Sequence, residues 1–535
     1  MKTIKALLSA LLAVTMLVGC GSGTSDGKVY YWASELDIMS LDSTVADDGM
    51  SFNAMHAFTE GLTGLDENGE TINALAEDWS VDGSGLVYTF KLRDAKWSNG
   101  TPVTANDFVY AWQRIIKNAG NYAYMFGSDG ANIAGADALL NGETTDFNTL
   151  GVKAADDKTL VVTLATKCPF FTDLMSFPCF YPQNEAFINE VGEENYATSP
   201  ETLISNGAFI LTEWEIGKVA VYEKNPDYYN ADAVKLDGLE LLLVQDASTA
   251  SMGFEQGDNY FCKIDSELVD KYKDSDEYAS YNEGYLFYLS MNFKNEYIAN
   301  KNIRYALAYA INRDDLATNI LKDGSRAASG FVPSQLSKSP DGKDFRDLAD
   351  VYTGYDLDKA QAYLDAGLKE LGKDSIEINL LYGTDESPMD TMAEYLQAAF
   401  SKLNGLTITM TATTKQDRIN NKMKNGKYDI ACTRWGPDYA DPTTYLNLLS
   451  STNSNNYGGY ENADYDKLLR QVLNESDLSA RYQLMIDAEK IIMEDYAYIP
   501  VFEKGSATLQ SSKVTGLVNA AVGVPWTFTY VDIAE

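Results

Sequence analysis

Alternating apolar and polar positions predict β-strands in several parts of the chain. In LVYTFKLRD (residues 86–94) a large apolar residue occupies every second position from 88 to 92, which is the period of a strand with one buried face. TLVVTLAT (159–166) and LELLLVQD (239–246) are also predicted strands. The second of these is so continuously apolar that we expect both of its faces to be buried.

Apolar residues spaced three and four positions apart predict helices elsewhere. In TANDFVYAWQRIIKN (104–118), Thr104 and Asn106 are candidate helix caps, and the apolar residues that follow share one helical face. NIRYALAYAINRDDLATNIL (302–321) is predicted to form one long helix, and MDTMAEYLQAAFSKL (389–403) another. The methionines and aromatic residues in these apolar stripes are interpreted as core residues.

Strand and helix patterns alternate in the last third of the chain. The predicted strand SIEINLLYG (375–383) precedes a predicted helix, and the strand LTITMTATT (406–414) follows that helix. A polar helical stretch at 416–424 then leads into the strand YDIACTRW (428–435). This order predicts an α/β lobe with parallel strands and crossover helices, in which ligands lie beyond the carboxyl ends of the strands.

The last of these strands continues into RWGPDYADPTTY (434–445), which combines aromatic rings, two aspartates and two prolines. Each proline excludes regular helix around it and favours extended backbone before it. We therefore expect an ordered loop that presents carboxylates beside aromatic faces. Such a loop could hold a metal ion, a sugar, an ammonium group or no ligand.

Composition and charge narrow the classes of protein and partner. The chain has 535 residues, of which 45% are hydrophobic and 22% charged, so we expect a globular protein with two or three cores. Its 42 basic and 78 acidic residues give a formal net charge of −36. A protein this acidic repels nucleic acid and anionic lipid headgroups, so neither is expected as a partner.

The N-terminus has the pattern of an export signal. Two lysines precede a mostly apolar run, Ala6–Val18, which is too short to span a bilayer comfortably, and Cys20 follows directly after a glycine. Residues 1–19 are predicted to be a signal peptide, and Cys20 resembles the acylated cysteine of a bacterial lipoprotein. The alternative is an ordinary secretory signal with an incidental cysteine. Residues 20–27 are then a flexible tether, and the lipid anchor is the only expected membrane contact.

The remaining cysteines and the single histidine exclude several kinds of site. No Cys-x-x-Cys pair occurs and His56 is the only histidine, so no metal site is predicted. Cys168 and Cys179 flank PFFTDLMSFP. An exported protein could join them in a disulfide, and two free buried thiols are the equally weighted alternative.

No complete catalytic constellation is present, so no catalytic residue and no cofactor are predicted. A Ser–His or Cys–His nucleophile would need His56, and there is neither a nucleophile elbow nor a glycine-rich phosphate loop. Asp438 and Asp441 could form the carboxylate pair of a glycoside hydrolase. Two acids three residues apart on one loop seldom flank a bond from opposite sides, so this remains a remote alternative.

Several long stretches resemble the peptide/nickel-type solute-binding proteins of bacterial ABC importers, especially the oligopeptide-binding branch. The stretches that carry this resemblance are LDSTVADDGMSFNAMHAFTEGLTGLDENG (41–69), LVYTFKLRDAKWSNGTPVTANDFVYAWQR (86–114), SNGAFILTEWEIGKVAVYEKNPDYYN (205–230), NIRYALAYAINRDDL (302–316) and TRWGPDYADPTTYLNLL (433–449). They run in order from about residue 30 to the C-terminus, and the predicted lipoprotein leader agrees with them independently.

The resemblance implies an α/β fold with two lobes, the type II or Venus-flytrap form of periplasmic binding proteins, with an additional domain inserted in the first lobe. Domain I would comprise residues 28–57, 182–283 and 500–535. Domain II, the inserted domain, would be 58–181, and domain III, the second lobe, 284–499. Ligand is expected between domains I and III, which close by hinge motion.

The implied function is that of an extracytoplasmic receptor, anchored to the bacterial cell membrane, that captures oligopeptides and delivers them to an ABC importer. The permease and ATPase would be separate chains, and the receptor itself would be a monomer and not an enzyme. The alternative within the family is a receptor for a non-peptide solute, a dipeptide or a metal chelate. In oligopeptide-binding relatives the peptide pairs with protein strands through its backbone.

In these relatives an aspartate of the motif matching WGPDY holds the α-amino group of the peptide, and that position is Asp438 here. The resemblance implies a set of further ligand-binding residues, which are Asp47, Asp48, Gly49, Tyr122, Phe287, Tyr288, Asn292, Trp435. Some relatives read the peptide carboxylate with basic residues in the strand before the tryptophan, and YDIACT has none. Arg434, Arg418 and Lys424 are nearby in the sequence, and Arg434 is included as a candidate contact without an assigned role.

Overall fold

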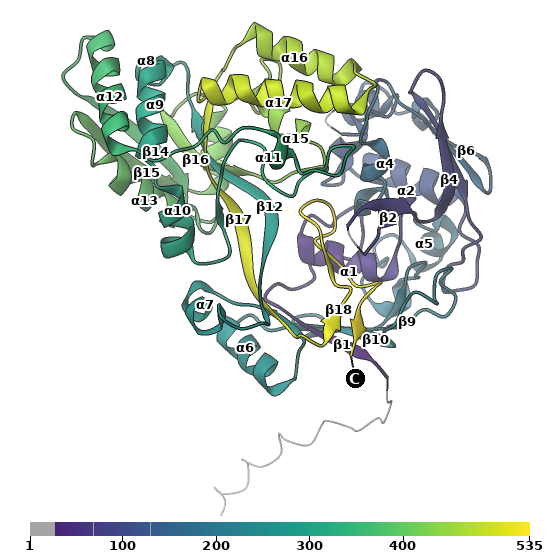
Figure 1. Ribbon diagram of the computed structural model, residues 1–535. Coiled ribbons are helices and arrows are strands. Elements are labelled where there is room, and N and C mark those ends of the chain that lie inside the picture. Colours follow the sequence, from purple (N-terminus) through teal and green to yellow (C-terminus); the bar gives the residue numbers. More distant parts are fainter. Residues whose placement is uncertain (1–26, 68, 129, 535) are drawn as a thin grey trace, which may run out of the picture.

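The computed structural model describes residues 27–67, 69–128 and 130–534 (Figure 1). These residues form two α/β lobes and a smaller domain beside the first lobe. We call residues 63–180 the inserted domain, residues 292–497 lobe 2, and the remaining residues up to 277 and after 510 lobe 1. The predicted signal peptide and Cys20 lie outside the described residues, as does all of the tether except its last residue. Within the described ranges no helix is long and apolar enough to cross a membrane.

One sheet of eleven strands runs through both lobes of the described chain. Its short strands are β1 (Val29–Ser34), β8 (Phe209–Glu215), β9 (Val219–Lys224), β10 (Gly238–Leu243), β11 (Phe261–Lys263), β13 (Arg326–Ala327), β14 (Ile376–Gly383), β15 (Leu406–Thr413) and β16 (Ile430–Trp435). Its two long strands are β12 (Tyr278–Met291) and β17 (Tyr498–Gln510). The order is β15-β14-β16-β12-β17-β11-β1-β10-β9-β8, with β13 paired to β17 beside this path.

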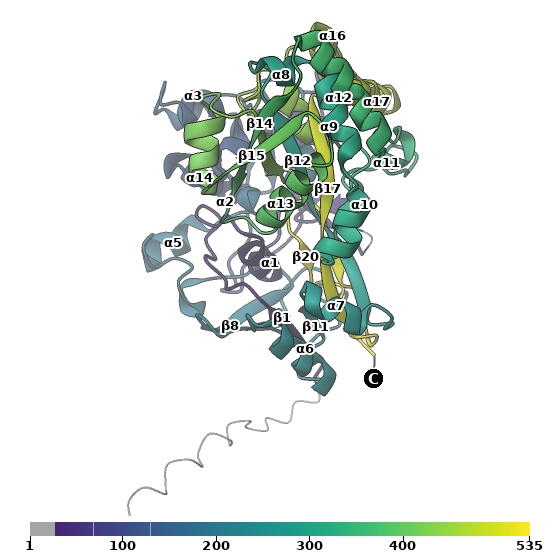
Figure 2. The ribbon, with the colours of Figure 1, turned by 90° about the vertical axis from the view of Figure 1, so that its left-hand side faces the viewer.

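The long strands β12 and β17 connect the lobes. They pair antiparallel and pass from lobe 1 into lobe 2, as Figures 1 and 2 both show. Their register shifts between Asn282 and Leu286, which is an irregularity of the kind that bends a strand. The connection between the lobes is therefore a two-stranded ribbon with a bend near its middle.

Helices cover the sheet in both lobes. In lobe 1 they are α1 (Gly49–Phe58), α5 (Glu185–Val191), α6 (Ala247–Gln256) and α7 (Ser266–Tyr272). In lobe 2 the main ones are α8 (Glu296–Ala299), α9 (Lys301–Ala310), α11 (Phe345–Leu348), α12 (Leu357–Leu371), α13 (Met389–Phe400), α15 (Thr443–Leu446), α16 (Ala463–Asn474) and α17 (Leu478–Glu494).

The predicted alternation of strands and helices in lobe 2 is confirmed. Strands β14, β15 and β16 are parallel, with α13 between the first two and a helical segment, Lys415–Met423, before the third. The buried residues of α13 include Met392, Leu396 and Phe400, which is the predicted apolar stripe. The sheet edge formed by the carboxyl ends of these strands carries the loop that begins at Trp435.

The prediction of one long helix at 302–321 is wrong. Helix α9 ends at Ala310, and Ile311 has extended backbone with φ −91° and ψ 113°. The side chain of Asn312 accepts a hydrogen bond from the backbone N–H of Asp315 and so caps a new helical segment, α10 (Arg313–Asp315), that continues to Leu321. Asparagine favours the first cap of a helix over its interior, because its side chain competes for backbone hydrogen bonds.

The prediction that residues 239–246 are buried on both faces is also wrong. Strand β10 lies between β1 and β9 in the sheet. Leu239 and Leu241 are buried, whereas Glu240, Leu242 and Leu243 are only partly buried. The strand has neighbours on both sides within the sheet, but one face of the sheet is incompletely covered at this position.

The inserted domain has its own sheet of four antiparallel strands, in the order β4 (Ala76–Val81), β5 (Val87–Leu92), β7 (Thr159–Thr163) and β6 (Val152–Asp156). The predicted alternation in β5 is confirmed, because Tyr88, Phe90 and Leu92 are buried. Helix α2 (Ala105–Lys117) starts with a capping box between Thr104 and Asp107. Smaller elements are β2 (Thr63–Leu65), β3 (Thr71–Asn73), η1 (Ala123–Phe126), α3 (Ala136–Leu140), α4 (Phe171–Leu174) and η3 (Pro178–Phe180).

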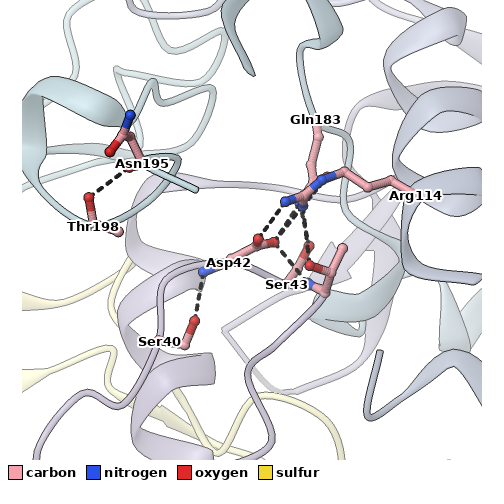
Figure 3. A network of polar contacts seen from close by, with 8 residues as sticks. Ser40, Asp42, Ser43, Arg114, Gln183, Asn195 and Thr198 are labelled. Atoms are coloured by element: carbon pink, nitrogen blue, oxygen red, sulfur yellow. Dashed lines mark hydrogen bonds and ion pairs between the residues drawn. The ribbon is translucent and has the colours of Figure 1, made fainter. Parts of the chain in front are cut away.

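Lobe 1 and the inserted domain share one hydrophobic core, whereas lobe 2 has a separate core. A buried ion pair also joins lobe 1 to the inserted domain (Figure 3). Arg114 of α2 donates from both terminal nitrogens to the carboxylate of Asp42, at 2.8 Å each. Gln183 donates to the same carboxylate at 3.1 Å. The inserted domain is therefore part of the same packed body as lobe 1, and the predicted two-lobed α/β fold with an inserted domain is confirmed.

Candidate functional site: a cavity between the lobes

A cavity of about 1060 Å³ lies between lobe 2 and the body formed by lobe 1 and the inserted domain. Its walls come from the inserted domain, from lobe 2, from β12 and from the C-terminal loop 519–523. The lining residues that matter for the site are Phe170, Tyr281, Lys338, Asp438, Tyr439 and Arg481. The cavity thus meets the predicted loop at the carboxyl end of β16.

The first half of the loop is held by a threonine from its second half. Oγ1 of Thr444 accepts the backbone N–H of Asp438 at 3.1 Å and the indole N–H of Trp435 at 3.4 Å. The hydroxyl of Tyr445 donates to the carbonyl oxygen of Gly284 in β12 at 2.5 Å. Gly284 has φ +80°, and a Cβ there would lie 2.1 Å from the carbonyl oxygen of Ala521. The loop therefore sits against the bend of the connecting ribbon, where only glycine fits.

Asp441 is a structural residue of this loop. Its two oxygens accept from Arg481 of α17 at 2.5 and 3.0 Å, and one of them also accepts from the hydroxyl of Thr443 at 2.6 Å. Burial alone would raise the pKa of Asp441, but the charge and hydrogen bonds of Arg481 outweigh burial and lower the pKa. Because this carboxylate is neutralised and buried, it is a poor candidate for the base of a hydrolase.

Asp438 has different surroundings. Its side chain is partly exposed, and one of its oxygens accepts a hydrogen bond from the hydroxyl of Tyr124 in the inserted domain at 3.2 Å. Tyr122 stacks on Tyr124 with ring centroids 5.8 Å apart. Burial raises the pKa of both tyrosines, and the negative charge of Asp438 raises it further. Both hydroxyls are therefore neutral donors at physiological pH.

The predicted residues at the start of α1 have mixed roles. The carboxylate of Asp48 caps the helix, accepting from the backbone N–H of Ser51 at 2.8 Å and from its hydroxyl at 2.6 Å. Asp47 is exposed and accepts a hydrogen bond from Nδ2 of Asn121 at 3.2 Å. Asn121 directly precedes Tyr122 in the chain, so this contact places Asp47 near Tyr122. A side chain at Gly49 would touch Pro525 at 3.2 Å.

The structure does not bring Phe287, Tyr288 and Asn292 to the cavity. Their exposed fractions are 1%, 5% and 3%, and all three lie in the core of lobe 2. Phe287 stacks on Phe502 with ring centroids 4.5 Å apart, and Asn292 donates to the carbonyl oxygen of Tyr428 at 2.6 Å. Tyr288 packs against the ring of Phe331, with centroids 5.3 Å apart, so these side chains are covered by other residues and do not face the cavity.

Arg434 is a partly exposed cation at the carboxyl end of β16. Its Nε donates to Glu386 at 3.1 Å, and its guanidinium carbon lies 4.4 Å from the centre of the Tyr285 ring. Glu386 also binds Arg418, whose side chain is 1% exposed. Arg418 is thus occupied in the core, whereas Arg434 remains accessible.

Four residues of the site were not predicted: Tyr124, Phe170, Thr444 and Arg481. Tyr124 stands two residues after Tyr122 in the motif NYAYMF, so the sequence did contain a signal for it. Thr444 lies in the predicted loop itself. No sequence pattern links Phe170 or Arg481 to the loop, because their contacts depend on how the domains pack.

The four cysteines among the described residues are buried, and His56 is partly buried. In this structure Cys168 and Cys179 are two separate free thiols. Nδ1 of His56 is 2.8 Å from the hydroxyl of Tyr181, and burial lowers the pKa of His56 to about 4. In the described part of the chain no group of three or more His, Cys, Asp or Glu side chains could hold a metal ion.

Comparison with known proteins places this geometry in a family. The model of the middle region of the bacterial extracellular solute-binding proteins of family 5 matches residues 70–457. A dipeptide-binding protein of Lactococcus lactis is 32% identical over 542 residues, covering 97% of each chain.

Two solved structures, one bound to peptide and one unliganded, are similar to this chain. OppA of Listeria monocytogenes bound to peptide is 33% identical, with a TM-score of 0.73 and coverage of 96% of this chain and 100% of its own. The unliganded open form of the murein tripeptide-binding protein MppA is 26% identical, yet its TM-score is 0.81, with coverage of 95% and 98%. The TM-score is thus higher with the unliganded open form than with the peptide-bound structure. The chain belongs to family 5 of the bacterial extracellular solute-binding proteins.

Proposed function

We propose that this protein is an extracytoplasmic receptor that captures oligopeptides between its lobes and delivers them to an ABC importer. The observation that carries the proposal is the carboxylate of Asp438 at the wall of a cavity of about 1060 Å³ that both bodies of the protein line. This volume is at the upper end of the range for small-molecule pockets, which is about 300–1,000 Å³. An extended peptide with a free amino end supplies the cation that such a carboxylate binds.

Recognition of the amino end depends on charge. An ammonium group forms charge-assisted hydrogen bonds with a carboxylate, and these are stronger than bonds between neutral groups. In this proposal Trp435, Tyr122 and Asp47 contact the ligand near Asp438, although none of the three lines the cavity. Arg434 is retained as a candidate contact without an assigned role, and the cavity itself is lined by another cation, Lys338.

Capture is coupled to closure of the lobes. Apart from Tyr439, the hydrophobic cores of the two bodies consist of separate residues, and a bent ribbon of β12 and β17 joins the bodies, so we expect each body to move as a unit. A peptide that contacts both bodies binds the closed arrangement more tightly than the open one and shifts the population toward it. The separate permease and ATPase chains of the importer then receive the closed, loaded form.

The receptor acts at the membrane surface in this proposal. Processing after residue 19 leaves Cys20 as a lipid-anchored N-terminus, and the short tether lets the lobes move freely above the bilayer. The protein works as a monomer and turns no substrate over. Dipeptides are the second candidate ligand, because the Lactococcus lactis relative is named a dipeptide-binding protein.

The first test changes Asp438. We expect Asp438→Ala to weaken peptide binding by about 2–5 kcal/mol, as for removal of one partner of a desolvated charge pair. Acetylation of the peptide amino group removes the other partner and should cost a similar amount. Isothermal titration calorimetry measures both, with the exposed Asp232→Ala as the matched control. Unchanged affinity in both experiments would remove Asp438 from the site.

The second test identifies the natural ligand. Native mass spectrometry of freshly purified protein should detect bound masses that fit peptides. A bound oligosaccharide would refute the peptide assignment, and release of cleaved products would refute the receptor role.

A further inference from the structure

The inserted domain contacts the Asp438 loop at two adjacent residues. The hydroxyl of Tyr124 donates to one oxygen of Asp438 at 3.2 Å. The ring of Phe170 stacks face to face on Tyr439, with centroids 3.9 Å apart and planes only 5° from parallel. Both contacts cross from the body that contains lobe 1 into lobe 2.

The second contact is a packed one. Tyr439 is 6% exposed, and it is the one residue of lobe 2, among those the structure describes, that joins the core shared by lobe 1 and the inserted domain. Aromatic stacking of this kind adds specific orientation to the burial of apolar area. The backbone next to Asp438 is therefore fixed by a ring from the other body.

Lobe 2 holds the same loop from the opposite end. Arg481 binds Asp441, and Thr444 accepts the backbone N–H of Asp438. These two contacts fix the path of the chain, whereas the hydroxyl of Tyr124 reaches the carboxylate of Asp438 from the inserted domain. Lobe 2 thus sets where the loop runs, while the inserted domain acts on the carboxylate.

We propose that the inserted domain positions the amino-binding carboxylate of lobe 2, with Tyr124 and Phe170 as the positioning residues. The inference rests on the proposed role of Asp438 in binding a peptide amino group. It gives the inserted domain a direct part in ligand recognition, although that domain shares its core with lobe 1 and Asp438 belongs to lobe 2.

The mechanism follows from the hydrogen-bonding capacity of a carboxylate. Its two oxygens offer about four acceptor positions, so a carboxylate that accepts a bond from Tyr124 can also accept bonds from the ammonium group of a peptide. A carboxylate that is already oriented loses less rotational freedom when the ligand binds, and more of the interaction energy remains as affinity. A tyrosine hydroxyl suits this task because it stays neutral and cannot replace the cation.

The decisive variant is Tyr124→Phe, which removes one hydroxyl and keeps the ring. We measure binding of tetraalanine and of N-acetyl-tetraalanine by calorimetry. We expect the affinity for tetraalanine to fall about three- to tenfold, which is within the range for a typical hydrogen bond. Affinity for the acetylated peptide should stay unchanged, because that peptide has no ammonium for Asp438. Tyr355→Phe, at an exposed tyrosine of lobe 2, is the control and should alter neither.

A double-mutant cycle separates positioning from a structural effect. If Tyr124 acts through Asp438, Tyr124→Phe should have no further effect on tetraalanine binding in an Asp438→Asn background. Phe170→Leu keeps an apolar side chain without the stacked ring, and it should lower the affinity for tetraalanine selectively as well.

The inference fails if Tyr124→Phe leaves tetraalanine binding unchanged or makes it tighter. It also fails if both peptides lose affinity equally, or if the loss persists without the Asp438 charge. Failure of the proposed function looks different: the wild-type protein would then bind neither peptide, or would bind both equally well.

Discussion

The two halves of the loop after β16 contain the same acidic residue in opposite situations. In the first half, Asp438 is partly exposed at the wall of the cavity and accepts a bond from a neutral hydroxyl of another domain. In the second half, Asp441 is 5% exposed and is held by both terminal nitrogens of Arg481. Only three positions separate them.

The difference teaches how one loop combines stability with binding. A buried carboxylate that is already paired with a cation has little left to offer a ligand, but its removal leaves the cation buried and unpaired. A carboxylate at a cavity wall contributes less to folding. The second half therefore anchors the loop, and the first half lines the cavity.

The largest effect is expected when Asp441, which anchors the loop to Arg481, is removed. Asp441→Ala leaves the guanidinium of Arg481 buried without its partner, so we expect the free energy of unfolding to fall by about 3–5 kcal/mol. Urea unfolding followed by tryptophan fluorescence measures this change. Asp438→Ala is the matched control and should stay within about 0.5 kcal/mol of the wild type. An equal loss in both variants would mean that the two halves do not differ.

A smaller effect is expected from a third carboxylate, that of Glu60, which lies at the junction of lobe 1 and the inserted domain. One of its oxygens accepts from Tyr228 at 2.9 Å, and the other is buried with no hydrogen-bond partner among the described residues. Burial raises the pKa of Glu60 to about 7, although hydrogen bonds from Tyr228 and Tyr229 and the charge of Arg93 lower it in part. Glu60 thus contrasts with Asp441, whose pKa is lowered.

The pH dependence of the two carboxylates should have opposite signs. Because the pKa of Glu60 is raised in the folded state, its contribution to stability is fully present below about pH 4.5 and is lost as the pH rises through about 7. Glu60→Gln removes this loss and should make the protein more stable than the wild type by about 2 kcal/mol at pH 8. Thermal unfolding at pH 5 and pH 8 checks the sign. A variant that is less stable at both values would contradict it.

The smallest effect tests the link between the halves. Thr444→Val keeps the shape of the side chain and removes the acceptor for Asp438 and Trp435. Loss of these two hydrogen bonds should lower the free energy of unfolding by about 1–2 kcal/mol. Peptide affinity should fall with it, since the backbone of Asp438 is released. Thr443→Val is the matched comparison, because the hydroxyl of Thr443 donates to Asp441 and not to the first half of the loop. This variant should lower stability and leave peptide affinity unchanged.

Much of the fold could be predicted from local pattern. The strand at 87–92, the helix at 389–400 and the parallel order of β14, β15 and β16 follow from hydrophobic periods of two and of three to four residues. The break in the helix predicted at 302–321 could not be foreseen, because the apolar pattern continues across Asn312, which caps the second helical segment. Periodicity shows which face of an element is apolar and is less sensitive to a cap within it.

The candidate site was predictable only in part. The motif WGPDY identified Asp438, and the structure places that residue at the wall of the cavity. The same resemblance suggested Phe287 and Tyr288, but the exposed fraction of a strand residue depends on what packs against the face from which its side chain projects. Phe502 and Tyr498 pack against these two rings and come about two hundred residues later in the chain, so no pattern within β12 indicates that its side chains are covered.

The sequence by itself determined most of the local elements, the family and the presence of two aspartates on one proline-containing loop. Only the tertiary structure decided which aspartate is neutralised and which faces the cavity. The physical reason is distance along the chain: Arg481 lies 40 residues after Asp441, and Tyr124 lies 314 residues before Asp438. The role of a carboxylate depends on the group that packs against it, and packing brings together residues that the sequence keeps far apart.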